Sequence, residues 1–295
     1  MADIFLTHNT QLKKLRNKNL EVPARAKRIL ESEGYHAVIN GYRDPFKATT
    51  SPEFIFLPGT HFDEIYALYE MDRDLRNVFL KKILKIEQAL RSSIAYHFSS
   101  NNKSNNRAYL DFRNFDYTRT QKNIMKHGKL RTKYIGTDVH NVIATLSKKM
   151  SSSHNEVIKH YITEHQSVPL WILVNTLTMG ELLYLYTFLM PNQRAAVAKD
   201  FNVTDDELHW FIEQLKIYRN KCAHEERFYC YKQSWGMTDV YHLHNRMKFF
   251  FTKSDANKLD RNVINTFTKY SSSFKTIPFS NLLTEMGYPA NYLTT

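Results

Sequence analysis

Apolar side chains recur every three to four residues over long stretches of the chain, which is the spacing that gathers them on one face of an α-helix. The clearest stretch predicts a helix over about 60–98, with Thr60 as its N-cap. A second stretch begins with Thr204 and Glu207, spaced as in a capping box, and predicts a helix over about 205–229. The buried face of this second helix is expected to hold Leu208, Phe211, Ile212, Leu215 and Tyr218.

The rest of the chain is also predicted to be mainly helical, because it has only eight glycines and eight prolines. A helix or helix pair over 11–33 should break at Val22-Pro23, since proline removes a backbone donor. Further helices are expected at 138–150, 154–165, 238–253 and 257–270, with two buried helices that meet near Gly180. Extended backbone is expected in the loop-rich part from 41 to 60, and residues 106–136 have too weak a period to assign.

The sequence contains no repeat and no clear linker. It therefore predicts an all-α fold in a single domain over 1–295, with a C-terminal helical extension over about 235–295.

The charge balance changes this picture by indicating a partner. A formal charge of +12 and a pI near 9.5 favour a polyanion, either nucleic acid or acidic lipid headgroups. The 18 tyrosines and 19 phenylalanines could stack on unpaired bases, although most aromatic side chains fill cores.

Other features exclude several classes of protein. Two cysteines form no disulfide framework, and the N-terminal sequence lacks the apolar run of a signal peptide. The most apolar segment, 168–191, is interrupted by Asn175, Gly180 and Glu181, so no membrane span is expected and the protein is predicted to be cytoplasmic. The sequence has no glycine loop that could cradle a phosphate, which argues against an ATPase or a kinase.

The candidate chemistry lies in the segment 218–230, YRNKCAHEERFYC, where the second predicted helix ends. Its residues suit RNA cleavage without a metal: the imidazole of His224 can transfer protons, and the guanidinium of Arg219 can hold a phosphate through two donors. Asn220, four residues before His224, faces it on a helix and can orient the ring. The alternative is that the three residues form the polar edge of a helix, because this Arg–His spacing also arises by chance.

The spacing raises a geometric difficulty. Arg219 and His224 are five residues apart, which is about 140° around a regular helix. The reach of arginine, a distortion of the helix or a second copy of the chain could bring the two groups to one phosphate. We favour a homodimer, since two facing histidines would supply both the base and the acid.

Three more basic residues, Arg91, Lys221 and Arg227, are candidate RNA contacts. Arg91 lies four residues after Glu87, and the alternative is that the two form a surface ion pair. The run 72–76 is expected to be a solvated helix face. Cys222, His224 and Cys230 have no fourth ligand of suitable spacing for zinc, so neither a metal nor a cofactor is expected.

Seven segments in a characteristic order carry a resemblance to a known family. They are GYRDPF at 41–46, FDEIYALYEMDRDLR at 62–76, KIEQALRSSIAYHF at 85–98, NRAYLDFRNF at 106–115, VPLWILVNTLTMGELLYLY at 168–186, YRNKCAHEERF at 218–228 and EMGYP at 285–289. Together they resemble the Abi-like proteins of bacterial abortive infection, of the AbiD and AbiF type, in the HEPN superfamily of helical ribonucleases. The HEPN signature is an Arg followed after four to six residues by a His, with a polar residue just behind the Arg, and Arg219, Asn220 and His224 match it.

The resemblance implies a HEPN-type helical bundle core with extra helices and a loop-rich insertion. It implies a metal-independent endoribonuclease that cleaves RNA by 2′-hydroxyl attack and leaves a 2′,3′-cyclic phosphate. Similar proteins act as toxins in phage defence, usually with a site completed by dimerisation, and a small antitoxin RNA restrains some of them.

The chain departs from similar sequences at Glu225, which often is a second His, at Asn175, which often is acidic, and at 178–180, where Ser-Phe-Gly is usual. The competing function is that of a catalytically inactive RNA-binding helical protein. A third class, a protein of the membrane surface, would require binding to anionic lipid.

Overall fold

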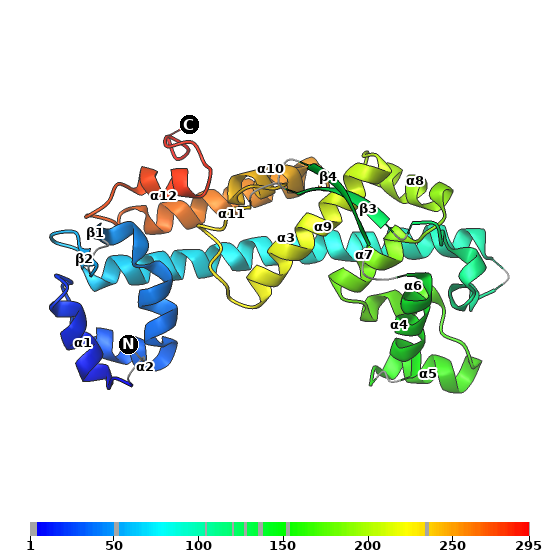
Figure 1. The fold of residues 1–295 in the computed structure, drawn as a ribbon, viewed down its shortest axis with the longest axis horizontal. Coiled ribbons are helices and arrows are strands. Elements are labelled where there is room, and N and C mark those ends of the chain that lie inside the picture. Colours follow the sequence, from blue (N-terminus) through cyan, green and yellow to red (C-terminus); the bar gives the residue numbers. More distant parts are fainter. Residues whose placement is uncertain are drawn as a thin grey trace. The chain divides into compact units, whose positions relative to one another are not determined.

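The computed structural model describes residues 5–49, 53–103, 105–119, 121–126, 129–134, 138–151, 154–233 and 236–294 (Figure 1). Helices dominate these residues, and their strands form two separate two-stranded sheets, so the predicted all-α class is confirmed. The chain packs as two compact units, one of residues 1–82 with 220–295 and one of residues 83–219. The sequence predicts one domain over 1–295, and the two units divide that range between them.

The first unit opens with α1 (His8–Arg16) and α2 (Ala26–Glu33), which are separated around Pro23 as predicted. A π-helical turn follows, and then two short antiparallel strands, β1 (Lys47–Thr49) and β2 (Ile55–Phe56), supply the expected extended backbone. The first half of α3 (Phe62–Asn101) crosses this unit. Its remaining helices are α10 (Val240–Lys248), α11 (Lys253–Ser271) and α12 (Phe279–Glu285).

The second unit holds the rest of α3 and a β-hairpin that the sequence did not predict, formed by β3 (Gln121–Lys126) and β4 (Lys129–Tyr134). Its helices are α4 (Val139–Ser151), α5 (Glu156–His165), α6 (Leu170–Leu173), α7 (Met179–Thr187) and α8 (Pro191–Asp200). It also holds α9 (Asp205–Ala223) as far as Arg219, and the last four residues of that helix belong to the first unit. The two apolar helices expected near Gly180 are α6 and α7. A capping box of Thr178 and Glu181 begins α7.

α3 confirms the strongest prediction, because every apolar position in its expected stripe is buried: Phe62, Ile65, Tyr69, Leu75, Phe79, Ile83, Ile86, Leu90 and Ile94. The predicted cap is wrong. The Thr60 hydroxyl donates to the carbonyl oxygen of Leu57 at 2.7 Å, so it does not serve the helix. The amide of Asp63 instead donates to Nδ1 of His61 at 3.1 Å. The His61 ring thus accepts a hydrogen bond from one of the first amides of the helix, which have no partner within the helix.

α9 begins as predicted, since the amide of Glu207 donates to Thr204 Oγ1 at 3.3 Å and the amide of Thr204 donates to Glu207 Oε2 at 2.9 Å. The five apolar residues of its predicted face are all buried. The helix ends at Ala223 rather than near 229. The reason is Glu225, whose φ of 55° lies in the left-handed region and cannot continue a right-handed helix.

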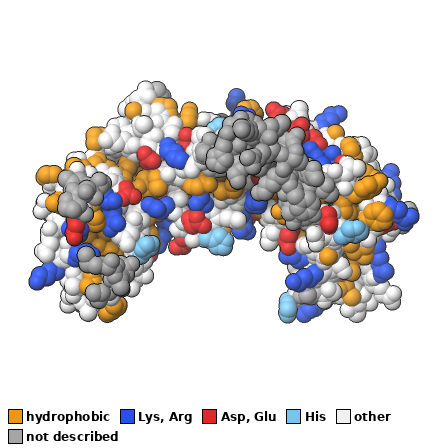
Figure 2. Space-filling view, in the orientation of Figure 1, with side chains coloured by type: hydrophobic (Ala, Val, Ile, Leu, Met, Phe, Trp, Pro, Cys, Tyr) orange, Lys and Arg blue, Asp and Glu red, His pale blue; other side chains and the backbone are white. Residues whose placement is uncertain are grey.

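Within the described residues, no helix is both long enough and apolar enough to cross a bilayer. On the face drawn in Figure 2, Lys and Arg side chains are interspersed with Asp and Glu side chains. The positive charge of the described residues on that face is therefore spread over several elements.

Candidate functional site

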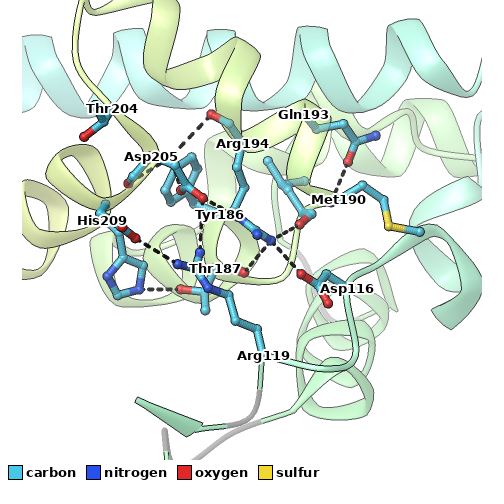
Figure 3. A network of polar contacts seen from close by, with 12 residues as sticks. Asp116, Arg119, Tyr186, Thr187, Met190, Gln193, Arg194, Thr204, Asp205 and His209 are labelled. Carbon is cyan, nitrogen blue, oxygen red and sulfur yellow. Dashed lines mark hydrogen bonds and ion pairs between the residues drawn. The ribbon is translucent and has the colours of Figure 1, made fainter. Parts of the chain in front are cut away.

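The N-terminal end of α9 is fixed by a network around Arg194 of α8, whose side chain is 7% exposed (Figure 3). Its Nε donates to Asp205 Oδ2 at 2.8 Å, and its Nη1 donates to Asp116 Oδ2 at 3.1 Å and to the Leu189 carbonyl at 2.5 Å. The Tyr186 hydroxyl donates to Asp205 Oδ1 at 2.8 Å. These contacts join α7, α8, the segment before β3 and the first residue of α9 within the second unit.

The charge of Asp205 suits its position. Burial raises the pKa of this carboxyl, but the hydrogen bonds from Arg194 and Tyr186 outweigh burial, so the pKa lies below its ordinary value. The carboxylate therefore stays ionised in the first turn of α9, where it faces the positive end of the helix dipole. The start of the motif helix is held by both hydrogen bonds and charge.

Arg219, the proposed phosphate-binding residue, lies in the last turns of α9, and its side chain is 29% exposed. Its Nε faces Oε2 of Glu87 at 3.6 Å, and the Glu87 side chain is only 1% exposed. Arg91 donates from Nη2 to the other oxygen of Glu87 and to the Leu177 carbonyl, the latter at 2.7 Å. One buried carboxylate thus lies between two guanidinium groups.

This cluster corrects the prediction for Glu87 and Arg91. The ion pair forms, but it is largely buried, because α3 turns this face toward the second unit's interior. Neither Glu87 Oε2 nor Arg219 Nε has a hydrogen-bond partner among the described residues. The Glu87–Arg219 contact is consequently an attraction between charges at slightly more than hydrogen-bond length.

The C-terminal end of α9 forms a Schellman motif, in which Glu225 is the left-handed residue. The amide of His224 donates to the Asn220 carbonyl at 2.9 Å, and the amide of Glu226 donates to the Lys221 carbonyl at 3.0 Å. His224 is therefore the last residue held by a helical hydrogen bond, and it is exposed. Asn220 is exposed as well, and its predicted role in orienting the imidazole stays a prediction.

The two other predicted RNA contacts near the motif are both paired. Lys221 contacts Glu226 Oε2 through Nζ at 2.8 Å, and its Nζ lies 4.0 Å from the ring centroid of Tyr231. Arg227 is 49% exposed and donates from Nη1 to the Gly41 carbonyl at 3.3 Å. Both positions keep a cation near His224 in sequence.

Cys222 has the opposite environment. It is buried, and burial raises the pKa of its thiol to about 12, so the thiol stays protonated at neutral pH. A protonated, buried thiol is a poor zinc ligand.

Asp72 of α3 anchors the chain that follows the motif. Its side chain is fully buried, and it accepts hydrogen bonds from the Tyr42 hydroxyl at 2.7 Å and from Nη1 of Arg76 at 2.7 Å. The backbone amides of Phe228 and Tyr229 also donate to it, at 3.0 and 2.7 Å. The prediction that the run 72–76 is a solvated face is therefore wrong for Asp72 and Arg76, because backbone donors from a distant segment satisfy the buried carboxylate.

Burial raises the pKa of the Asp72 carboxyl, while the charge of Arg76 and the hydrogen bonds oppose that rise. Asp72, Tyr42, Arg76 and the amides of Phe228 and Tyr229 form what we call the Asp72 hub. It lies in the first unit and fixes the segment that begins four residues after His224.

Sequence reasoning missed the importance of Glu87 and Asp72, yet the sequence carries a signal for both. Glu87 lies four residues after Ile83 and three before Leu90, and Asp72 lies three residues before Leu75, so each falls on the apolar stripe of α3. A charged residue inside an apolar stripe must be paired or hydrogen-bonded when the helix packs. That position, rather than its spacing to the nearest basic residue, predicts a buried polar hub.

Comparison with known protein families gives a match over most of the chain. The model of the family described as Abi-like protein matches residues 28–230, which include α3, the Glu87–Arg91–Arg219 cluster, His224 and the Asp72 hub up to Tyr229. The chain belongs to the Abi-like protein family. Membership suggests that this Abi-like protein has a role in abortive infection.

No curated protein and no solved structure matched the chain. The family match ends at residue 230, so α10, α11 and α12 of the Abi-like protein lie outside the matched region.

Proposed function

We propose that this Abi-like protein is a metal-independent endoribonuclease of the HEPN type and acts as a toxic effector in abortive infection. His224 transfers the proton between the 2′-hydroxyl and the leaving oxygen, Arg219 holds the scissile phosphate, and Asn220 orients the imidazole. The reaction is a transesterification: the 2′-oxygen attacks phosphorus, the bond to the 5′-oxygen breaks, and a 2′,3′-cyclic phosphate and a 5′-hydroxyl remain. Arg91, Lys221 and Arg227 are proposed RNA contacts.

The observation that carries the proposal is the environment of Arg219. The buried carboxylate of Glu87 attracts the partly exposed guanidinium of Arg219 by charge, with 3.6 Å between Glu87 Oε2 and Arg219 Nε. An arginine that served only as a helix edge would have no need of a buried anion, which is costly to desolvate. Glu87 is therefore proposed as a positioning residue for Arg219.

The position of His224 supports the same chemistry. Its exposure leaves the imidazole reachable by a substrate, and the Schellman motif and the Asp72 hub restrict the chain on its C-terminal side. A proton-transfer group must be held within hydrogen-bond reach of the atom it serves, and local restraint serves that requirement. We further propose that a homodimer brings two His224 side chains to one phosphate.

The decisive experiment compares the purified wild type with His224→Ala on a mixture of end-labelled single-stranded RNAs in the presence of EDTA. The wild type should produce fragments that end in a 2′,3′-cyclic phosphate. The His224→Ala variant should lose cleavage by at least about 100-fold, the size of a typical general acid–base contribution, while it still binds RNA.

His154→Ala is the matched control, because it removes an exposed imidazole that belongs to no proposed site. It should cleave like the wild type. Cleavage that persists in His224→Ala, or that stops when EDTA is added to the wild type, would refute the proposed mechanism. RNA binding without any cleavage by the wild type would favour the inactive RNA-binding protein instead.

A further inference from the structure

A recess in the second unit lies where α3 ends, outside the groups that the proposed reaction uses. It has a volume of about 300 Å³ measured to its open mouth. The residues that line it belong to the end of α3, to the loop that follows and to the start of α6, and all of them lie in the described part of the chain. Those that bear on its chemistry are Asn102, Lys103, Asn105, Tyr109 and Trp171.

The inner part of the lining is apolar and already in place. Phe98 and Leu170 are buried. Tyr109 is buried as well, and its hydroxyl donates to the Val168 carbonyl at 2.6 Å, which ties the loop after α3 to the segment before α6. A preformed recess with an apolar inner wall and a few polar groups suits the edge of a flat, uncharged ring.

Two asparagines of the lining offer complementary hydrogen-bonding groups. Asn102 Nδ2 donates to the Phe98 carbonyl at 2.9 Å, and Oδ1 of Asn105 accepts a hydrogen bond at 2.9 Å from the amide two residues further on. These local bonds fix the orientation of both side-chain amides, so Asn102 keeps its oxygen as an acceptor and Asn105 keeps its nitrogen as a donor. The amide of Asn105 donates to the Asn102 carbonyl at 3.0 Å, which holds the two residues in one turn. Nucleobase edges carry donors and acceptors side by side in the same way.

The rim of the recess is aromatic and positively charged. Trp171 is 47% exposed. Lys103 and Arg107 are exposed, and residues 99–110 contain no Asp or Glu. An indole face can stack on a base of any kind, and cations beside it attract the phosphates of the strand. The alternative is that Trp171 contacts another protein and that the asparagines only form turns.

The recess shares its two walls with the Glu87–Arg91–Arg219 cluster. From Arg91 to Phe98, α3 rises by about 10 Å at 1.5 Å per residue. On the opposite wall, Trp171 lies six residues before Leu177, whose carbonyl accepts a hydrogen bond from Arg91 at 2.7 Å. About 10 Å corresponds to about three stacked nucleotides at about 3.4 Å each. A strand with one phosphate at the cluster would therefore bring a nearby base to the recess.

We propose that the recess binds one unpaired nucleobase of the RNA strand whose scissile phosphate lies at Arg219. The base stacks on Trp171, and its edge enters the recess and meets Oδ1 of Asn102 and Nδ2 of Asn105. The inference rests on the proposed ribonuclease function, and it makes the recess the place where the protein reads sequence near the cut. Duplex RNA fits less well, because its bases are stacked and their pairing edges are occupied.

The test uses the full-length chain with His224→Ala, which leaves RNA uncut, and short labelled oligoribonucleotides followed by fluorescence anisotropy. One oligonucleotide carries abasic sugars throughout, and four others carry a single adenine, guanine, cytosine or uracil at the centre. Because a lone base can slide into register with the recess, the ratio of each affinity to that of the abasic strand reports the base alone. At least one base should strengthen binding by about fivefold or more, which is the lower end of what one stacked base contributes.

Three variants locate this gain. Trp171→Ala should remove it, whereas Trp171→Phe should keep most of it, because a phenyl ring still stacks. Asn105→Asp keeps the oxygen that accepts the backbone amide but replaces the Nδ2 donor by a second acceptor, so the order of the four bases should change. Its added negative charge weakens all five oligonucleotides alike and cancels in the ratios.

Phe249→Ala is the matched control, because it removes a side chain that is 66% exposed and belongs to the first unit. It should leave every ratio unchanged. Circular dichroism and size-exclusion chromatography check that each variant is folded and keeps its oligomeric state.

Four results would overturn the inference. The first is that no base strengthens binding to the parent, and the second is an unchanged order of bases in Asn105→Asp. The third is an equal gain in Trp171→Ala, which together with a smaller oligomer would make Trp171 a protein contact. The fourth is tighter binding of a free mononucleotide than of the single-base oligonucleotide, which would assign the recess to free nucleotides.

Failure of the ribonuclease proposal is distinguishable from failure of this inference. In that case the wild-type chain cleaves no RNA, while the gain from a single base and its loss in Trp171→Ala persist.

Discussion

Replacing Asp72 by alanine is expected to destabilise the protein more than any other single carboxylate replacement on α3 before Lys82. The substitution leaves Arg76, whose side chain is 3% exposed, without a counter-charge, and breaking a buried ion pair in this way costs about 3–5 kcal/mol. It also removes the acceptor of the Phe228 and Tyr229 amides, and an orphaned buried amide costs about 1–3 kcal/mol. These terms overlap, so a total of at least about 4 kcal/mol is expected.

The matched control is Asp74→Ala, two residues along the same helix. Asp74 pairs with Lys269 at 2.8 Å, and both side chains are partly exposed, at 36% and 62%. An exposed pair contributes about 0–1 kcal/mol. Thermal unfolding followed by circular dichroism at pH 7 should show a Tm about 8–16 °C lower for Asp72→Ala, against about 2–4 °C or less for Asp74→Ala.

A Tm for Asp72→Ala within a few degrees of that of Asp74→Ala would refute this account of the hub. The double variant Asp72→Leu with Arg76→Met identifies the source of the loss, because it removes both charges and should recover part of the stability. If the double variant is no more stable than the single one, the loss belongs to the amides of Phe228 and Tyr229 rather than to the charge of Arg76.

Three further predictions follow from the geometry. Burial lowers the pKa of His244 to about 4 from 6.5, so the unfolded chain takes up a proton between these values that the folded chain does not. The free energy of unfolding should therefore fall by up to about 3 kcal/mol as the pH drops from 6.5 to 4, and His244→Asn, which can still pair with Tyr288, should show a smaller fall in urea titrations. At the left-handed Glu225, substitution by Gly should be neutral or stabilising by up to about 1 kcal/mol and substitution by Val destabilising, and equal effects in denaturant unfolding would contradict the backbone argument. If two His224 side chains serve one phosphate, a mixed dimer of wild type and His224→Ala holds one imidazole at the site, so an excess of His224→Ala should suppress wild-type cleavage; cleavage by the wild type that is unchanged by the excess would place the whole site in one chain.

Much of the fold is determined locally and could be predicted. The apolar stripe of α3 consists of nine residues between Phe62 and Ile94 at helical spacing, and only a helix places all nine on one buried side. The break at Pro23 and the capping box of Thr204 and Glu207 depend on backbone donors within a few residues. The candidate motif, Arg219 to His224, is likewise local, since it is defined by residue type and spacing on one helix end.

Tertiary structure decided which groups the buried charges meet. The apolar stripe of α3 indicates that Asp72 is buried, but only the folded chain brings the amides of Phe228 and Tyr229 to it, whereas Asp74 pairs with Lys269 at the surface. The buried carboxylate of Glu87 similarly lies near the guanidinium of Arg219, which is far away in the sequence. A buried charge is tolerated only where distant donors converge on it, and local sequence does not reveal those donors.

Backbone geometry sets the remaining limit on what could be predicted from the sequence. The end of α9 depends on a left-handed Glu225, where neither glycine nor asparagine marks the turn. Residues 121–134 show no helical period because their backbone forms the two antiparallel strands β3 and β4, and their sequence has too few apolar residues to predict strands. The sequence by itself therefore determined the main helices and the candidate catalytic residues, whereas only the folded chain placed the buried Glu87 beside Arg219 and Asp72 beside the amides of Phe228 and Tyr229, because these contacts depend on segments brought together by packing.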